Sequence, residues 1–409
     1  MNVKPLFTLT RSAAAAAGSA WTALWTFPAM LLAAFLVAWG AEAAQFLISQ
    51  GLALAALAWL QTLPEFAVEA VIAWEAGQDP TRAHLAIANL TGAIRLLVGL
   101  GWPMVYFVAA YYARRRREAA GGPWFPDVVL DREHAVEVMG QVPPLLYFTV
   151  IWFKRSLSVV DAAVLLGLYA AYLWVLWQCP PQGAEHVDAA PAVARWAYRQ
   201  PGARRVAAIG GLFVAGGLLL YLTAHPFLES MLALAATLGV SQFVFVQWVA
   251  PFLSEFPEKL SAFYWARRVT HAPMALMNLA SSNINQWTVL AAMIPLVYGW
   301  SHALAGHGWA PFRFDAAQHA EIGLTIAQSV LAVLLLMNMR FGWLDAAALF
   351  VLWAVQFAFP SLRVAVALAY LAWGAWLVVL AAVGKQRFVA PGLFVDVLRE
   401  NRARRRRTG

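Results

Sequence analysis

The sequence predicts an all-α polytopic membrane protein with about 11 transmembrane helices, built as two inverted five-helix repeats plus one extra C-terminal span. Three observations support this fold class. Hydrophobic residues make up 62% of the 409 residues and charged residues only 12%, with a mean hydropathy of +0.64. Apolar runs of about 20 residues, the length of a membrane-spanning helix, recur from end to end. Two of these runs contain a central Pro-Glu pair, Pro64-Glu65 and Pro257-Glu258.

The first half of the chain contains five expected spans. Residues 1–20 hold Lys4, Arg11 and an Ala-rich run. The apolar stretch that follows is too long for a signal peptide, so we interpret it as a retained first span. The third span ends at the basic run Arg114–Arg117. The expected spans are residues 21–40, 42–76, 83–112, 136–153 and 157–178, the second broken at residues 62–64.

The second half repeats this plan after a Pro-rich connecting loop, residues 179–202. Its spans are expected at residues 203–222, 227–266, 269–299, 320–339 and 342–359, the second again broken, at Pro257. An additional span at 361–383 precedes a basic tail. The expected organisation is an N-terminal segment 1–20, a first repeat 21–178, the loop 179–202, a second repeat 203–360, an additional helix 361–384 and a tail 385–409.

Three short motifs recur in the same order in both halves, which argues against chance similarity. They are Gln61-Thr-Leu-Pro-Glu65 with Ser254-Glu-Phe-Pro-Glu258, Asn89-Leu-Thr-Gly92 with Asn278-Leu-Ala-Ser281, and Asp161-Ala-Ala with Asp345-Ala-Ala. Because each repeat has an odd number of spans, the two repeats must cross the membrane in opposite directions. In such inverted repeats the substrate site lies near the bilayer midplane.

The distribution of Lys and Arg predicts the orientation. With about eleven spans, most of these residues fall on one side, including the runs Arg114–Arg117 and Arg404–Arg407. That side is predicted to be cytoplasmic, since positive residues are retained there. We therefore expect an integral protein of a bacterial inner membrane, with the N-terminus outside and the C-terminus inside.

The carboxylates at the centre of two spans indicate a cation site. A charge near the middle of a bilayer costs at least ~2.5–3.5 kcal/mol. A proline frees carbonyl groups of the preceding turn, which is tolerated at depth only where they line a cavity. Ca²⁺ takes about six to eight oxygen ligands, and carboxylates with free carbonyls can supply several. A buried carboxylate also accepts a proton readily, so such a site could exchange a metal ion for protons.

Other classes of protein fit less well. The one cysteine, Cys179, leaves no disulfide framework, thiolate metal site or iron–sulfur cluster. The net charge of +8 lies mainly in short loops and the tail, which indicates membrane topology and not nucleic-acid binding. The sequence has no Gly-rich phosphate loop, His-Glu-x-x-His motif or nucleophile–base pattern. We therefore expect no enzymatic activity and no tightly bound cofactor.

Several polar residues within the spans have two interpretations. Glu69 follows Glu65 at i+4 and could share its helix face. Asn89 and Asn278 could support the site or simply join helices by hydrogen bonds. A proline kink in a membrane helix can be structural, but a Pro-Glu pair at matching places in two repeats favours function.

The motifs resemble those of the calcium:cation antiporter superfamily, which includes the sodium/calcium exchangers. Each of its repeats carries a pattern close to Gly-Thr-Ser-x-Pro-Glu on one helix and Gly-Asn-x-x-Gly-Ser-Asn-x-x-Asn/Asp on the next. The first repeat here has Leu60-Gln-Thr-Leu-Pro-Glu65 and Ala88-Asn-Leu-Thr-Gly-Ala-Ile-Arg-Leu-Leu97, and the second has Leu253-Ser-Glu-Phe-Pro-Glu258 and Met277-Asn-Leu-Ala-Ser-Ser-Asn-Ile-Asn-Gln286. The resemblance covers roughly residues 21–360.

The resemblance implies a set of cation-binding residues. It implies Glu65 and Glu258 as the central metal ligands. The polar positions that it implies around them are Gln61, Thr62, Ser254, Glu255, Ser282 and Gln286. We also expect supporting roles for Asn89, Asn278, Asn283 and Arg95. In the first repeat, the positions equivalent to Ser282 and Gln286 are Ala93 and Leu97, which cannot bind an ion.

The expected function is secondary antiport of Ca²⁺ or another cation against Na⁺ or H⁺, with inorganic cations and the lipid bilayer as the partners. The alternative is a non-transporting scaffold or sensor with the same fold, which Ala93, Leu97 and Arg95 favour. A buried guanidinium needs an anionic partner. We therefore expect Arg95 to pair with Glu65 or Glu258 and to restrict the number of bound ions.

Overall fold

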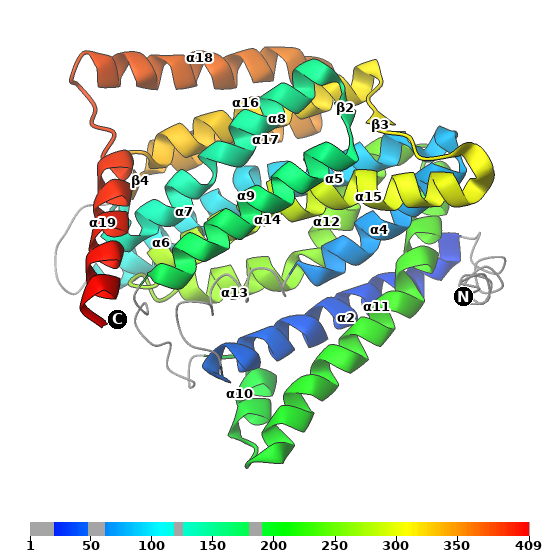
Figure 1. Ribbon diagram of the computed structural model, residues 1–409, viewed down its shortest axis with the longest axis horizontal. Helices are drawn as coiled ribbons and strands as arrows, with labels where there is room; N and C mark the ends of the chain where they lie inside the picture. Colours follow the sequence, from blue (N-terminus) through cyan, green and yellow to red (C-terminus); the bar gives the residue numbers. More distant parts are fainter. Residues whose placement is uncertain (1–19, 48–61, 118–125, 180–189, 409) are drawn as a thin grey trace. The chain divides into compact units, whose positions relative to one another are not determined.

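The computed structural model describes residues 20–47, 62–117, 126–179 and 190–408 (Figure 1). Within these ranges the chain is almost entirely helical, as expected. Eight helices there are long and apolar enough to cross a membrane, and two shorter apolar helices accompany them, α12 (Gln242–Ser254) and α17 (Trp343–Ala358). Residues 48–61 of the expected second span, Gln61 included, lie outside the described residues.

The contacts divide the chain into two compact units, each with segments of both repeats. The first unit comprises residues 1–93, 181–258 and 293–312, and the second residues 94–180, 259–292 and 313–409. The units therefore do not follow the repeat boundaries. Helices α5 (His84–Leu96), α13 (Phe256–Ala266) and α15 (Ala291–His302) each contribute residues to both units.

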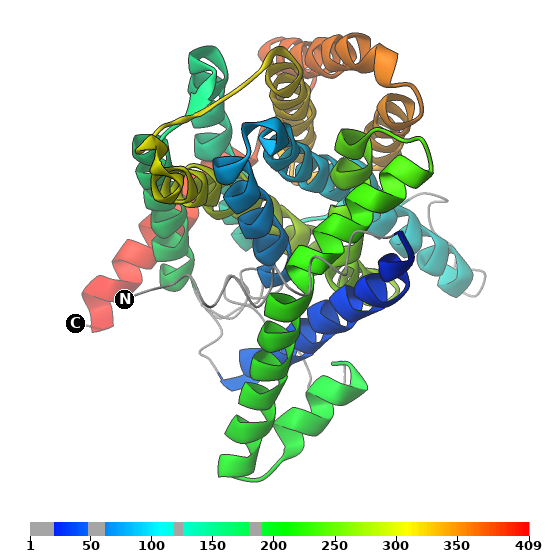
Figure 2. The ribbon, with the colours of Figure 1, turned by 90° about the vertical axis from the view of Figure 1, so that its right-hand side faces the viewer.

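The first unit is built around two long helices that lie side by side, α2 (Ala23–Ala44) and α11 (Ala203–Thr237) (Figures 1 and 2). A buried hydrogen bond of 2.7 Å joins the hydroxyls of Thr26 and Ser230 across them. The unit also contains η1 (Ala20–Thr22), η2 (Gln45–Leu47), α4 (Leu63–Gln78), η3 (Pro80–Arg82), α10 (Ala192–Arg199), α12 and η8 (Ala303–His307).

The second unit contains the remaining helices and three of the two-residue strands. Its helices are η4 (Leu97–Gly101), α6 (Trp102–Arg117), η5 (Arg132–His134), α7 (Ala135–Gly140), α8 (Val142–Lys154), α9 (Val159–Gln178), α14 (Ala272–Asn285), η7 (Gln286–Leu290), α16 (Ala316–Leu336), α17, η9 (Pro360–Leu362), α18 (Arg363–Ala382) and α19 (Ala390–Thr408). Its strands are β1 (Val128–Val129), β2 (Ser156–Leu157) and β4 (Arg340–Phe341), while β3 (Phe312–Arg313) lies at the unit boundary. Strands β1 and β4 pair antiparallel.

Three segments differ from the expected plan. The expected spans 203–222 and 227–266 were to meet near residue 225, but α11 continues without a break to Thr237. The helix contains Pro226, which membrane helices tolerate because neighbouring groups satisfy the freed carbonyl. The next interruption lies at residues 238–241, before α12. The expected connecting loop contains α10 and the expected tail contains α19.

Reciprocal hydrogen bonds relate the two repeats in the second unit. The Leu130 amide donates to the Met339 carbonyl at 2.9 Å, and the Phe314 amide donates to the Arg155 carbonyl at 3.0 Å. Leu130 and Arg155 belong to the first repeat, and Phe314 and Met339 occupy the same places in the second. Arg155 and Met339 also share a left-handed backbone, with φ of 56° and 59°. Each repeat thus contributes the same donor and acceptor, as a two-fold relation requires.

The helix of each second motif contains a π-helical turn at the same position. These turns are η4, which begins at Leu97, and η7, which begins at Gln286. The sequence motifs align Leu97 with Gln286. Single π-helical turns within α-helices are rare and frequently lie at functional sites. Their agreement to the residue supports the repeat independently of the hydropathy pattern.

Candidate cation site

Glu65 lies in the first turn of α4 and is fully buried. Pro64 precedes it within that turn, where its missing amide proton leaves no hydrogen bond unmade. Thr62 is the N-cap residue, and its carbonyl accepts the Phe66 amide at 3.0 Å. A helix N-terminus favours negative charge. The local sequence therefore places a buried carboxylate at a helix N-terminus.

Glu258 occupies the equivalent place in the first turn of α13 and is 1% exposed. The expected interruption of this helix is confirmed, because α12 ends at Ser254 and α13 begins at Phe256. Glu255 is the C-cap of α12, and its amide donates to the Pro251 carbonyl at 3.0 Å. The Ser254 hydroxyl donates to the Ala250 carbonyl at 2.9 Å. Ser254 and Glu255 are each only 2% exposed.

Both Pro-Glu pairs belong to the first unit. Helix α4, which begins beside Glu65, packs against α12, which ends just before Glu258. Helix α5 approaches α12 at Gly92, where an added Cβ would lie 1.8 Å from the Gln247 carbonyl oxygen. The side-chain Nε2 group of Gln247 also donates to the Thr91 hydroxyl at 3.3 Å. Close packing without a side chain at Gly92 therefore holds α5 against α12, the helix that ends just before Glu258.

Glu69 and Asn89 form a second buried polar pair in this unit. The Asn89 Nδ2 group donates to Glu69 Oε2 at 2.6 Å, and both side chains are fully buried. Within the described residues, Glu69 Oε1 and Asn89 Oδ1 have no hydrogen-bond partner. Glu69, the carboxylate that Asn89 contacts, thus lies about one helical turn beyond Glu65 on α4. The pair of Glu69 and Asn89 leaves one acceptor oxygen on each side chain available.

The other expected site residues belong to the second unit. Ser282 and Gln286 are fully buried, and Asn278 and Asn283 nearly so. The Asn283 Nδ2 group donates to Gln141 Oε1 at 3.0 Å, which gives Asn283 a role in joining α14 to the end of α7. Within the described part of the chain, the Ser282 hydroxyl has no hydrogen-bond partner. Ser282 is thus a buried oxygen that an ion could satisfy.

Arg95 has a carboxylate partner that differs from the expected one. Its Nη2 group contacts Glu321 Oε2 at 2.5 Å, and its Nη1 group donates to Gln356 Oε1 at 3.0 Å. Gln356 donates to Gln328 at 3.2 Å, and Gln328 donates to the Arg95 carbonyl at 3.1 Å, which closes a ring. The expected pairing with Glu65 or Glu258 is therefore corrected: the buried guanidinium of Arg95 is neutralised by Glu321 of α16.

Glu321 also accepts a hydrogen bond from Arg363, so one carboxylate serves two guanidinium groups. Sequence reasoning missed this cluster, although a signal existed. Glu321 lies near the start of the expected span 320–339, and Arg363 lies near the start of the expected span 361–383. Two expected crossings separate them, so the order of spans puts both on one side of the membrane. A search for opposite charges at span ends on the same side of the membrane would have predicted the pair of Glu321 and Arg363. Gln328 and Gln356 are uncharged, so no such search would have found them.

Comparison with known proteins identifies the family. The model of the sodium/calcium exchanger protein family matches residues 18–178 and 209–362. These two segments cover most of the chain. The chain belongs to the sodium/calcium exchanger protein family. The two matched segments also correspond to the two repeats that the sequence motifs defined. No curated protein matches the sequence.

Structures of other exchangers show the same fold. The H⁺/Ca²⁺ exchanger CAX is 30% identical, with a TM-score of 0.82, and the match covers 94% of this chain and 91% of CAX. The sodium–calcium exchanger NCX_Mj, soaked with 2.5 mM Na⁺ and 10 mM Sr²⁺, is 16% identical, with a TM-score of 0.52 over 83% of this chain and 97% of NCX_Mj. A further NCX_Mj structure, soaked with 100 mM Na⁺ and 10 mM Sr²⁺, is 17% identical, with a TM-score of 0.53 over 83% of this chain and 99% of that one. The chain is therefore a member of a cation antiporter family with the exchanger fold.

Proposed function

We propose that this exchanger-family protein moves Ca²⁺ or a related divalent cation across the membrane in exchange for protons. The observation that carries the proposal is the pair of buried carboxylates, Glu65 and Glu258, each in the first turn of a helix and each directly after a proline. Two carboxylates neutralise one divalent ion, or they take up two protons when the ion leaves. The exchange is then electrically balanced at the site itself.

Two observations favour protons over Na⁺ as the exchanged ion. The similar structure with 30% identity is that of an H⁺/Ca²⁺ exchanger. In the first repeat, two ligand positions implied by the resemblance are the apolar residues Ala93 and Leu97, both fully buried. A site with fewer oxygen ligands holds fewer metal cations, because each metal cation needs several oxygen ligands. A proton needs only one carboxylate oxygen. Na⁺ remains the alternative exchanged ion.

Flux in proteoliposomes tests this proposal. A pH gradient should drive ⁴⁵Ca²⁺ uptake by the wild-type protein, and Glu65→Gln or Glu258→Gln should abolish it. Asp396→Asn, which removes an exposed carboxylate, serves as the matched control and should retain full flux. Uptake driven only by a Na⁺ gradient would replace H⁺ by Na⁺ in the proposal. Unchanged flux in both Gln variants would refute the carboxylate site.

A non-transporting scaffold or sensor is the second candidate function. The observation that favours it is the loss of polar side chains at Ala93 and Leu97. Such a protein would bind a divalent cation at Glu65 and Glu258 without moving it. Cation binding to the purified protein, combined with no flux under either gradient, would support this alternative.

A further inference from the structure

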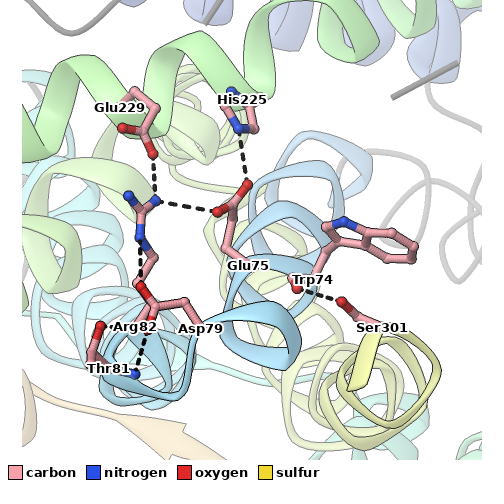
Figure 3. A network of polar contacts seen from close by, with 8 residues as sticks. All are labelled: Trp74, Glu75, Asp79, Thr81, Arg82, His225, Glu229 and Ser301. Carbon is pink, nitrogen blue, oxygen red and sulfur yellow. Dashed lines mark hydrogen bonds and ion pairs between the residues drawn. The ribbon is translucent and has the colours of Figure 1, made fainter. Parts of the chain in front are cut away.

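A mixed cluster of charged side chains joins three elements of the first unit, apart from the Pro-Glu pairs. Glu75 comes from α4, Arg82 from η3, and His225 with Glu229 from α11 (Figure 3). His225 Nε2 lies 3.0 Å from Glu75 Oε1. Arg82 Nη1 lies 2.5 Å from Glu229 Oε1 and 3.4 Å from Glu75 Oε2, so the guanidinium bridges the two carboxylates.

The three side chains other than Arg82 have the composition of a metal site. One carboxylate oxygen from each glutamate and one ring nitrogen of His225 all lie within 4.8 Å of one another. His225 and Glu229 are four residues apart on α11 and therefore share one helix face. Zn²⁺ binds such nitrogen and oxygen donors at about 2.0–2.2 Å, and three protein ligands plus water form an open site.

The burial of the cluster suits a reversible site. The side chains of Glu75, His225 and Glu229 are 20–22% exposed, so an ion would be partly desolvated yet reachable from water. The position that Arg82 takes between the carboxylates also marks where a positive charge is stabilised. Burial opposes the charge on Arg82, but the hydrogen bond and charge of Glu229, with Glu75 and Asp79, outweigh it and raise the pKa of the guanidinium.

Asp79 offers Arg82 a second partner. Its Oδ2 atom lies 3.9 Å from Arg82 Nε. The hydroxyl and amide of Thr81 donate to Asp79 Oδ1 at 2.7 and 3.0 Å, and these bonds lower the pKa of Asp79 and keep it ionised. Arg82 is 31% exposed and can therefore turn toward Asp79. A divalent ion would then neutralise Glu75 and Glu229 while Arg82 neutralises Asp79.

We propose that Glu75, His225 and Glu229 form a binding site for a divalent cation of the Zn²⁺ class, for which Arg82 is the built-in competitor. This site is separate from the proposed transport site. Glu65 and Glu75 lie on one helix, about 15 Å apart at 1.5 Å per residue. An ion bound here joins α4 to α11 and so restrains the helix that carries Glu65. The site is regulatory and does not depend on what the Pro-Glu carboxylates transport.

Calorimetric titration of the purified, chelator-treated protein with Zn²⁺ tests this site. His225→Gln should weaken one binding event by at least about tenfold, since a ligand is lost. Arg82→Gln should tighten the same event, because the competing cation is gone. His84→Gln removes a histidine that contacts only the Thr81 carbonyl among its described hydrogen bonds, and it should leave the affinity unchanged. Glu258→Gln should also leave it unchanged, which separates this site from the proposed transport site.

The gain of affinity in Arg82→Gln guards against misfolding, because a misfolded variant would not bind more tightly. Co²⁺ in place of Zn²⁺ provides a second readout, since a site with His225 as ligand gives visible absorption bands that His225→Gln should remove. Equal Zn²⁺ affinity in the wild-type and His225→Gln proteins would overturn the proposal. So would an Arg82→Gln protein without tighter binding.

Discussion

At the scale of single residues, buried charges in this protein are neutralised by partners far away in the sequence. Arg95 is fully buried and contacts Glu321, which also binds Arg363. Removing one member of a buried ion pair leaves an uncompensated charge, whereas replacing both members removes the desolvation penalty together with the attraction. The stability of the second unit should therefore respond differently to single and double substitutions here.

Glu321→Gln should destabilise the protein strongly, by about 3–5 kcal/mol, because Arg95 then lacks its carboxylate. The double variant Arg95→Met with Glu321→Gln should recover most of this loss. Thermal unfolding in detergent measures both. Glu137→Gln is the matched control: Glu137 is also buried, but the basic side chain that it contacts in the described structure is a histidine, His134, at 3.8 Å, and not an arginine. Equal losses in the single and double variants would contradict the proposed neutralisation of Arg95 by Glu321.

At the scale of secondary-structure elements, close packing positions α12, the helix that precedes Glu258. At Gly92 of α5, a Cβ atom would lie 1.8 Å from the Gln247 carbonyl oxygen of α12. The backbone cannot move aside as a flexible side chain can. Overpacking a well-packed interior typically costs 1–3 kcal/mol, so even one methyl group should separate these helices.

Gly92→Ala should therefore lower the melting temperature and reduce flux by displacing α12 and the Glu258 that follows it. Gly217→Ala is the control, because a Cβ at Gly217 meets nothing within 4 Å. Both changes replace a helical glycine by alanine, so they differ only in packing. A Gly92→Ala protein as stable and active as Gly217→Ala would show that the close approach is not required.

At the scale of the whole molecule, the reciprocal hydrogen bonds constrain the membrane topology. Leu130 follows the third expected span of the first repeat, and Met339 ends the fourth expected span of the second, so the bond between them requires these two linkers to lie on one side of the membrane. The bond from Phe314 to Arg155 requires the same of the linker after the third span of the second repeat and the linker after the fourth span of the first. The expected order of spans puts the same pairs of linkers on common sides. The absolute orientation stays a prediction of the positive-inside rule.

A membrane-impermeant maleimide tests the orientation. Thr81→Cys should be labelled from outside and Lys385→Cys from inside, since both positions are exposed and an odd number of expected spans lies between them. Cys179 should contribute little background near neutral pH, because burial raises the pKa of its thiol to about 11 and few thiolates are present. Labelling of Thr81→Cys only from inside would reverse the orientation. Labelling of both from one side would contradict the span count.

The sequence by itself determined the helical membrane fold, the repeat and the places of Glu65 and Glu258, because these features depend on local hydropathy, proline positions and recurring motifs. The helix interruption before Glu258 is local in the same way. Of the motif Gln61-Thr-Leu-Pro-Glu65, the structure describes Thr62 to Glu65, and Gln61 lies outside the described residues.

Only the tertiary structure decided the partners of buried polar groups and the division into units. Arg95 meets Glu321, and Glu75 meets His225, across 226 and 150 residues of chain. No local pattern encodes such contacts, because they depend on how separate helices pack. The contacts of α11 are of the same kind, since His225 meets Glu75 and Glu229 meets Arg82.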